Sequence, residues 1–153
     1  MKNIIYFFIL ISIVCSCGPK VVYEDTVLLP QYWSYEEPII FDAFDISDPN
    51  QKYDLMLVVK HDAEYKYQNF YTQVKTVFPD ETERTDPISI ELANKMGTWL
   101  SDCSGTSCTL YLVLRDNVKF KDKGKYQLTF VQDTREQKLE GLQSMELKLI
   151  EAD

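Results

Sequence analysis

Alternation of apolar and polar residues is the dominant pattern of the chain after residue 20. A period of two is typical of strands that bury one face of a sheet, and we find no amphipathic helix. The pattern is clearest in the last two apolar stretches, where every second residue from Tyr126 to Phe130 and from Met145 to Leu149 is large and apolar. The predicted strands cover residues 21–29, 38–41, 53–60, 69–78, 88–92, 109–120, 126–130 and 145–149.

Turn-forming and charged residues separate these predicted strands. Residues 45–50 and 121–124 are rich in Asp, Asn, Pro, Lys and Gly, and residues 79–86 form an acidic connection that we expect to be exposed. Thr134 and Gln137 have the spacing of a capping box, which indicates one helical turn. No repeat, low-complexity tract or linker divides the series. We therefore predict an all-β fold: a single antiparallel β-sandwich, jelly-roll-like, of about eight strands.

The first seventeen residues depart from the alternating pattern. Lys2 gives a positive start, and residues 4–14 are almost unbroken apolar sequence. This run is shorter than the roughly 20 residues of a transmembrane helix, but it suits a cleaved secretory segment. It ends in Val14-Cys15-Ser16-Cys17, where Val and Ser fit the lipobox positions before Cys17. We interpret the segment as a lipoprotein signal; an ordinary secretory signal with incidental cysteines is the alternative.

The domain organisation follows from this interpretation. Residues 1–16 are the cleaved signal peptide, residues 17–22 hold the lipidated cysteine and a short leader, and residues 23–153 form the β-sandwich. One domain fits this length, which is sufficient to bury a hydrophobic core.

Acidic residues outnumber basic ones by 24 to 16, which gives a formal net charge of −8. Loss of Lys2 with the signal makes the mature chain more negative by one charge. A negative surface repels phosphate backbones and anionic headgroups, so we expect no nucleic-acid partner. Membrane attachment must then come from the acyl chains on Cys17. Two or more chains anchor a protein stably, whereas a single chain binds reversibly.

Cys103 and Cys108 bracket a sequence of turn composition. They are the thiols that remain once Cys15 is cleaved off and Cys17 is acylated, so in an oxidising envelope we expect them to pair. A disulfide across so short a loop contributes about 2 kcal/mol in the chain-entropy model. A metal site would need two more soft ligands, of which only His61 is available, and a redox pair is usually Cys-x-x-Cys. We predict a structural disulfide.

Aromatic residues are the candidate ligand-binding groups. Trp33 and Tyr35 stand close together in the sequence, and Tyr65, Tyr67 and Trp99 follow. Exposed rings of this kind could form a platform on which sugars stack, although aromatics more often pack in the core and at its rim. Their burial distinguishes the two interpretations.

Catalytic chemistry finds little support in the sequence. We expect the single histidine, His61, to occupy an ordinary surface or rim position, and the motifs Gly-x-Ser-x-Gly and His-Glu-x-x-His are absent. Carboxylate pairs such as Glu36-Glu37 are too frequent in so acidic a chain to indicate a glycosidase. The spacing of Asp45, Asp48 and Asp54 does not match a calcium loop. We predict no enzyme activity, no metal and no cofactor.

Short motifs follow one another in a specific order behind the lipobox: Trp33, then residues 38–41, Tyr53 at the start of a predicted strand, residues 65–70, 92–100 and 124–126, and finally Arg135 followed by Leu139-x-Gly141-Leu142. This order resembles the gliding motility lipoprotein GldH family of Bacteroidetes. Thr134 departs from it, since the family pattern has Met before the arginine, and the cysteine pair is not expected from it. The resemblance adds Arg135 to the candidate binding residues.

The resemblance implies a non-catalytic envelope lipoprotein associated with gliding and the linked protein secretion, which acts through contacts with other envelope proteins. A glycan-binding module that uses exposed aromatics is the alternative function. Surface lipoproteins of this group commonly carry an acidic cluster after the acylated cysteine, but here the first acids are Glu24 and Asp25. The residue directly after Cys17 is not Asp, which in some bacteria retains a lipoprotein at the inner membrane. We therefore predict a lipid anchor in the outer membrane, with the domain on its periplasmic face.

Overall fold

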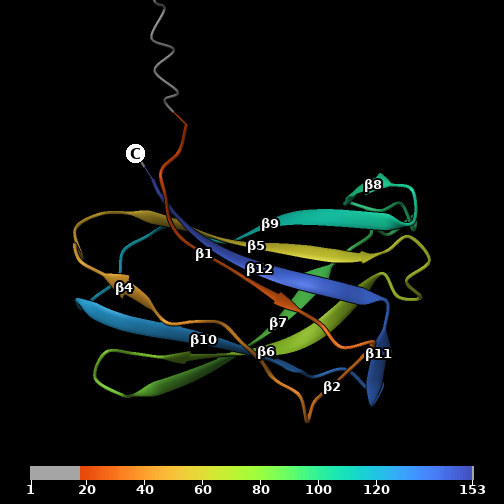
Figure 1. The fold of residues 1–153 in the computed structure, drawn as a ribbon, viewed down its shortest axis with the longest axis horizontal. Helices are drawn as coiled ribbons and strands as arrows, with labels where there is room; N and C mark the ends of the chain where they lie inside the picture. The colour runs from red at the N-terminus through yellow and green to blue at the C-terminus, as the bar shows by residue number, and fades with distance from the viewer. Residues whose placement is uncertain (1–17, 153) are drawn as a thin grey trace, which may run out of the picture.

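Antiparallel strands form the regular structure of the chain (Figure 1). The computed structural model describes residues 18–152, so the predicted signal peptide and Cys17 lie outside the described residues and their assignment stays a prediction. Between residues 18 and 152 no helix is long and apolar enough to cross a membrane. The strands are β1 (Val21–Leu28), β2 (Tyr32–Ser34), β3 (Ile39–Ile40), β4 (Phe44–Ile46), β5 (Tyr53–Asp62), β6 (Asn69–Val77), β7 (Glu83–Glu91), β8 (Asp102–Ser104), β9 (Ser107–Val118), β10 (Gly124–Gln132), β11 (Lys138–Glu140) and β12 (Leu142–Glu151).

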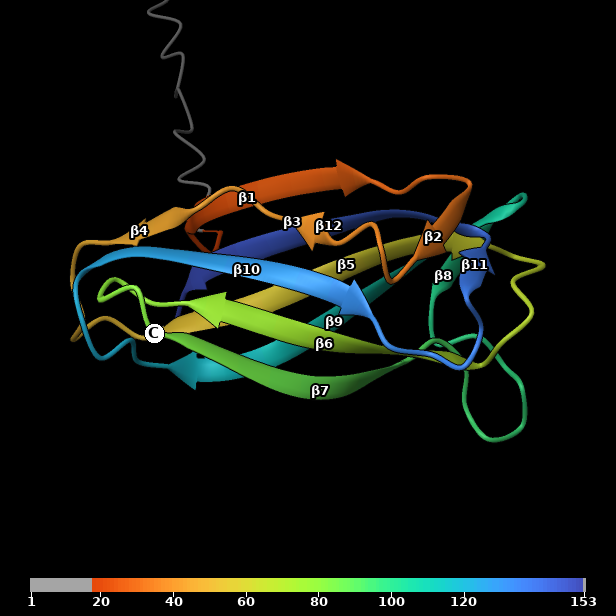
Figure 2. The ribbon, with the colours of Figure 1, turned by 90° about the horizontal axis from the view of Figure 1, so that it is seen from below.

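Two sheets pack face to face, one above the other in Figure 1 and one in front of the other in Figure 2. The first sheet has the order β1-β12-β5-β9-β8, and the second has the order β3-β10-β6-β7 with β4 also paired to β10. The partners are nested along the chain: β1 pairs with β12, β3 and β4 with β10, β5 with β9, and β6 with β7. This nesting is the jelly-roll arrangement. The predicted all-β, jelly-roll-like sandwich is confirmed.

The inner faces of the strands are those that the alternation predicted. Met145, Leu147 and Leu149 of β12 are at most 1% exposed, while the residues between them reach solvent. The inward side chains of β10, in the second sheet, belong to the same hydrophobic cluster. Each fully buried side chain of this size stabilises the fold by about 2 kcal/mol. The largest fully buried side chains are Trp33, Phe41, Phe70, Phe130, Ile46, Leu57, Ile90, Leu92, Leu139, Met145, Leu147 and Leu149.

The structure has twelve strands across residues 18–152 where about eight were predicted: several bounds differ by a few residues, and the short strands β2, β4, β8 and β11 were not predicted. Two differences are larger. The predicted strand at 88–92 begins earlier, at Glu83, because β7 is an edge strand that pairs only with β6 and tolerates exposed charged residues such as Glu83 and Arg84. The predicted helical turn at Thr134 is absent. The Gln132 side chain holds this segment as a loop instead, since its Oε1 accepts from the Thr134 N–H (2.9 Å) and its Nε2 donates to the Glu136 carbonyl (2.6 Å).

The sandwich has two distinct ends. The proximal end is where the described chain begins and where the Glu151 N–H donates to the Lys20 carbonyl at 2.9 Å. The distal end holds β2, β8 and β11 (Figure 1). β1 runs from the proximal end to the distal end over eight residues, a span of about 26 Å.

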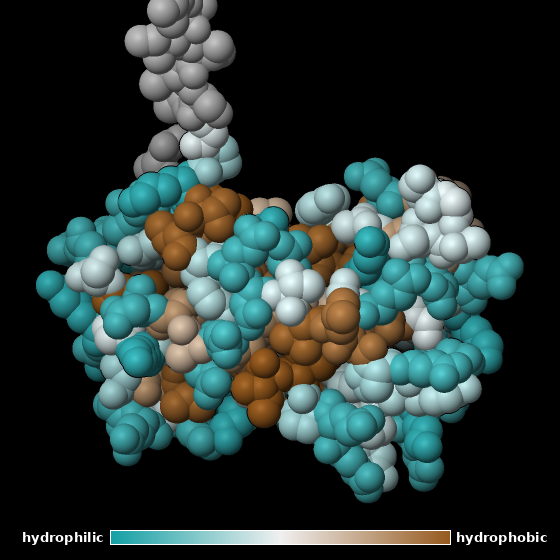
Figure 3. Space-filling model, viewed as in Figure 1, coloured by the Kyte–Doolittle hydropathy of each residue, from teal (hydrophilic) through white to brown (hydrophobic). Residues whose placement is uncertain are grey.

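Side chains close the edge of the sandwich beside β1. The Asp25 carboxylate accepts the Asp42 N–H at 2.7 Å, and the Tyr23 hydroxyl donates to the Asp42 carbonyl at 2.6 Å. Figure 3, seen from the side on which β1 lies, shows apolar side chains that reach the surface in a band among polar ones. The exposed large apolar residues of β1 and β3 are Val21, Val22, Leu28 and Ile40.

Candidate functional site

Segments that carry the sequence motifs meet at the distal end. Residues 62–68 are the central segment (the hub), because their main chain hydrogen-bonds to three other segments. The Gln68 carbonyl accepts two N–H groups of segment 92–101, at 2.8 and 2.9 Å. The carbonyls of Gly141 and Thr106 accept N–H groups of the hub at 2.8 and 2.9 Å. Three connections that are far apart in the sequence are thereby fixed to one another.

Trp33 belongs to the core of the distal end. Its side chain on β2 is 0% exposed, its Nε1 donates to the Glu37 carbonyl (2.9 Å), and its ring meets Phe70 edge to face with centroids 5.9 Å apart. Pairing of β2 with β11 places Leu139 opposite Trp33. Trp33 therefore offers no ring face to a ligand, whereas Tyr35, two residues later, is exposed.

Tyr65 is also buried, at 5% exposure, and its hydroxyl has no hydrogen-bond partner among residues 18–152. Burial raises the pKa of this hydroxyl. Gly141 lies against the ring with φ +95°, and a Cβ there would stand 3.2 Å from Tyr65 Cδ2. The packing of Tyr65 therefore requires glycine at position 141, both for the close approach and for the positive φ.

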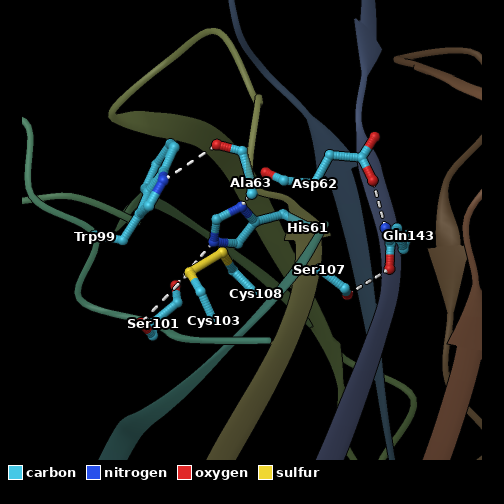
Figure 4. Close-up of a disulfide and its surroundings, with 9 residues drawn as sticks. All are labelled: His61, Asp62, Ala63, Trp99, Ser101, Cys103, Ser107, Cys108 and Gln143. Carbon is cyan, nitrogen blue, oxygen red and sulfur yellow. Dashed lines mark hydrogen bonds between the residues drawn. A yellow bond between two sulfur atoms is a disulfide. The ribbon is translucent and has the colours of Figure 1, made fainter. Parts of the chain in front are cut away.

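His61 is fully buried, so the predicted surface or rim position is wrong. Its Nδ1 lies 2.8 Å from the Asp62 carbonyl and must carry the hydrogen, which leaves Nε2 to accept the Ser101 hydroxyl at 2.8 Å (Figure 4). The half-buried Trp99 packs against the imidazole with centroids 4.8 Å apart, and its Nε1 donates to the Ala63 carbonyl (3.2 Å). These contacts tie β5 to the segment before β8.

The predicted disulfide between Cys103 and Cys108 is confirmed. The two cysteines face each other in the β8–β9 hairpin with Cα atoms 4.0 Å apart. Cys108 is fully buried and pairs with His61 of β5, while Cys103 is exposed. The bond therefore fastens the edge strand β8 to β9 beside the contact between His61 and Ser101 (Figure 4).

A hollow of about 570 Å³ opens at the distal end between β6 and the loop after β10. Tyr67 and Arg135, two of the predicted binding residues, both line it, together with Tyr71. Tyr67 is 37% exposed and Tyr71 is 53% exposed, so their rings are accessible. Aromatic faces beside an arginine and carboxylates can stack, make cation–π contacts and hydrogen-bond with a ligand. We call this cavity the distal hollow. It is lined by Tyr67, Asn69, Tyr71, Asp133, Thr134, Arg135, Glu136 and Leu139.

The sequence interpretation missed Tyr71 and Asn69. A signal for Tyr71 was present, because alternation in β6 places it on the face opposite the buried Phe70. Nothing local showed that this face would adjoin the loop after β10. Tyr35 and Trp99, by contrast, do not line the distal hollow.

A second hollow, of about 590 Å³, lies nearby and carries four charged side chains. Asp62, Glu64, Lys66 and Glu140 line it. The Asp62 carboxylate accepts a hydrogen bond from the Gln143 side chain, and Lys66 lies 3.9 Å from Glu140. Across residues 18–152, no three His, Cys, Asp or Glu side chains are grouped so that they could hold a metal ion.

Comparison with known proteins gives a consistent result. The family described as GldH lipoprotein matches residues 21–149. The chain is 25% identical over 158 residues to a protein named gliding motility lipoprotein GldH homolog from Christiangramia forsetii, which covers 99% of this chain and 96% of that protein. It is 26% identical over 132 residues to the gliding motility lipoprotein GldH of Flavobacterium johnsoniae, covering 86% of this chain and 81% of that protein. No solved structure matches significantly.

Proposed function

The chain belongs to the GldH lipoprotein family, and from this premise we propose that it is a non-catalytic component of a gliding and secretion apparatus that works by binding other envelope proteins. Acyl chains on Cys17 hold its proximal end at the membrane. The distal hollow supplies the binding surface.

The exposure of Tyr67, Tyr71 and Arg135 at the distal end is the observation that carries this proposal. Tyrosine and arginine are among the residues enriched at the energetic centres of protein interfaces, because they combine a large contact area with directed polar groups. The hollow lies about one strand length from the tethered end. A partner can therefore reach it without competing with the membrane.

Affinity capture of the lipidated protein from detergent-solubilised envelopes tests this function. We expect the double variant Tyr67→Ala/Arg135→Ala to recover its partner proteins at a yield at least tenfold lower, since loss of a residue at an interface centre costs about 2 kcal/mol. Tyr111→Ala is the matched control, because Tyr111 is 61% exposed but lies on β9 outside the distal hollow. Equal capture by both variants would show that the partner proteins bind a surface other than the distal hollow.

Glycan binding remains the second candidate function. Burial removes Trp33 and Tyr65 as stacking surfaces, but Tyr67 and Tyr71 still flank a hollow that contains Asn69 and acidic side chains. An aromatic ring beside such polar groups suits a sugar. Titration of the purified protein with envelope oligosaccharides should then show binding that Tyr67→Ala abolishes. If no oligosaccharide binds while protein capture depends on Tyr67, only the interaction function stands.

We place the domain on the periplasmic face of the outer membrane. The support is the sequence after Cys17, where Glu24 and Asp25 are the first acids and no acidic export signal adjoins the cysteine. Protease added to intact cells should leave the domain uncut until the outer membrane is permeabilised. Digestion in intact cells would place the domain at the cell surface and favour the glycan-binding candidate.

A further inference from the structure

A cavity of about 450 Å³ opens at the proximal end, opposite the distal hollow. It lies where the β6–β7 and β9–β10 connections meet the start of β10. We call it the proximal cavity. Its floor contains Phe44, Phe78, Phe120 and Tyr126, and its rim carries Arg84, Arg115, Lys119 and Lys121.

The floor is an aromatic cluster that is only partly covered by protein. Phe120 contacts Phe44 and Tyr126 with ring centroids 5.7 and 4.8 Å apart, and Phe78 meets Tyr126 at 5.9 Å. Phe44 and Tyr126 are buried, but Phe78 and Phe120 are only half-buried. A ligand that covered these rings with hydrocarbon would gain about 25 cal/mol for each Å² removed from water.

The rim is locally basic although the chain as a whole is acidic. Arg84 is engaged, since its Nε lies 2.7 Å from Asp86. Arg115, Lys119 and Lys121 are exposed and have no carboxylate within 4 Å among the described residues. These three cations are available to an anion from outside.

Two acids, Asp80 and Asp122, share the lining with these cations. Asp80 already accepts the hydroxyl and the N–H of Thr82, at 2.6 and 3.1 Å. Because Asp86 neutralises Arg84, the balance is three basic side chains, Arg115, Lys119 and Lys121, against these two acids. An acidic surface therefore contains a small region that attracts anions.

The cavity is close to the membrane if Cys17 is the acylated residue. Gly18, Pro19 and Lys20 separate Cys17 from β1, and three extended residues span at most about 10 Å. The start of β1 and the proximal cavity are at the same end of the sandwich, because Tyr53 pairs with both Glu151 and Val118. The tether thus holds this end near the lipid headgroups.

We propose that the proximal cavity binds an anionic phospholipid of the membrane in which the protein is anchored. One acyl chain lies over Phe78 and Phe120, and the phosphate contacts Arg115, Lys119 and Lys121. Guanidinium and ammonium groups are the usual phosphate partners in proteins, and an apolar cavity with a few polar groups is the usual form of a small-ligand site. The contact holds the domain upright, with the distal hollow turned away from the bilayer. The proposal rests on anchoring through Cys17.

Photocrosslinking in reconstituted vesicles tests this site. The full lipidated chain with Phe120 replaced by p-benzoylphenylalanine is placed in vesicles of phosphatidylglycerol and phosphatidylethanolamine, and lipid adducts are measured by mass spectrometry. We expect an adduct with phosphatidylglycerol that falls at least tenfold in Lys119→Glu/Lys121→Glu, since each lysine near an anionic lipid contributes about fivefold. Lys123→Glu/Lys125→Glu is the matched control, because it changes the same charge on neighbouring residues that do not line the cavity.

The outcomes separate the cavity from the anchor. Flotation of the protein with the vesicles reports the acyl anchor, while the adduct at position 120 reports the cavity. A floated protein with no more lipid adduct at Phe120 than with the probe at Tyr111 would overturn the proposal. Equal adduct yields in vesicles of phosphatidylcholine alone, or equal losses in the two lysine pairs, would do the same. Adducts in cell envelopes with a polypeptide instead of lipid would reassign the cavity to a protein partner.

Discussion

The two ends of the sandwich use aromatic and charged side chains in different ways. The distal hollow exposes tyrosine hydroxyls beside Arg135 and carboxylates, so it offers directed polar groups to a partner. The proximal cavity combines phenylalanines with Arg115, Lys119 and Lys121, which have no carboxylate within 4 Å among residues 18–152, so it offers an apolar floor and an attraction for anions. In the proposed arrangement, the lipid contact and the protein contact are separated by about the length of one strand.

Removing the acyl anchor should have the largest effect, because neither end of the sandwich would then be held at the membrane. We expect Cys17→Ala to lose membrane association completely, as measured by fractionation after a high-salt wash. Cys15→Ala is the control, since Cys15 leaves with the signal peptide and its replacement should change nothing. Quantitative membrane association of the Cys17 variant would show that another attachment exists.

Trp33→Ala tests whether the distal end belongs to the same cooperative unit as the rest of the sandwich. The side chain is fully buried, so its loss should reduce the free energy of unfolding by about 3–5 kcal/mol in a urea titration. The exposed Tyr35 provides the matched control, and Tyr35→Ala should change stability by less than about 0.5 kcal/mol. Similar values for both variants would contradict the assignment of Trp33 to the core.

The disulfide sharpens the comparison because it lies at the distal end alone. We expect Cys103→Ser/Cys108→Ser to lose about 2 kcal/mol of stability in the chain-entropy model. Hydrogen exchange should rise in β8 and in segment 92–101, which the disulfide and Ser101 connect to β5, but remain unchanged in β4 and the β9–β10 connection. Two free thiols in peptides from envelope-purified protein would refute the pairing.

Tyr65→Phe should have the smallest effect and the opposite sign. Removing a buried hydroxyl that has no partner among the described residues should raise the free energy of unfolding by about 1 kcal/mol. Burial raises the pKa of Tyr65 in the folded state above its value in the unfolded chain, near 10. The wild type should therefore lose stability as the pH rises above about 10, and the variant should lose less. Identical alkaline profiles would contradict this.

The strands were predictable because their signal is local. Alternation at every second residue identified the inner faces of β10 and β12, and the boundary error at β7 arose where an edge strand tolerates charges at Glu83 and Asp86. The disulfide was predictable from a count of thiols. Local pattern did not distinguish buried from exposed candidate binding residues. Trp33 and Tyr65 lie inside the sandwich, while Tyr67 lies on its surface.

By itself, the sequence determined the fold class, the cysteine pair and the resemblance to a lipoprotein family, because each depends on residue identity and spacing along the chain. Only the tertiary structure decided the rest. It buried His61 through partners such as Ser101, 40 residues away, and it brought Tyr67 to Arg135. It also gathered Arg115, Lys119 and Lys121 over an apolar floor, although the total charge of the chain is negative. Burial and local charge depend on which distant segments meet, and in this fold nested strand pairing sets those meetings.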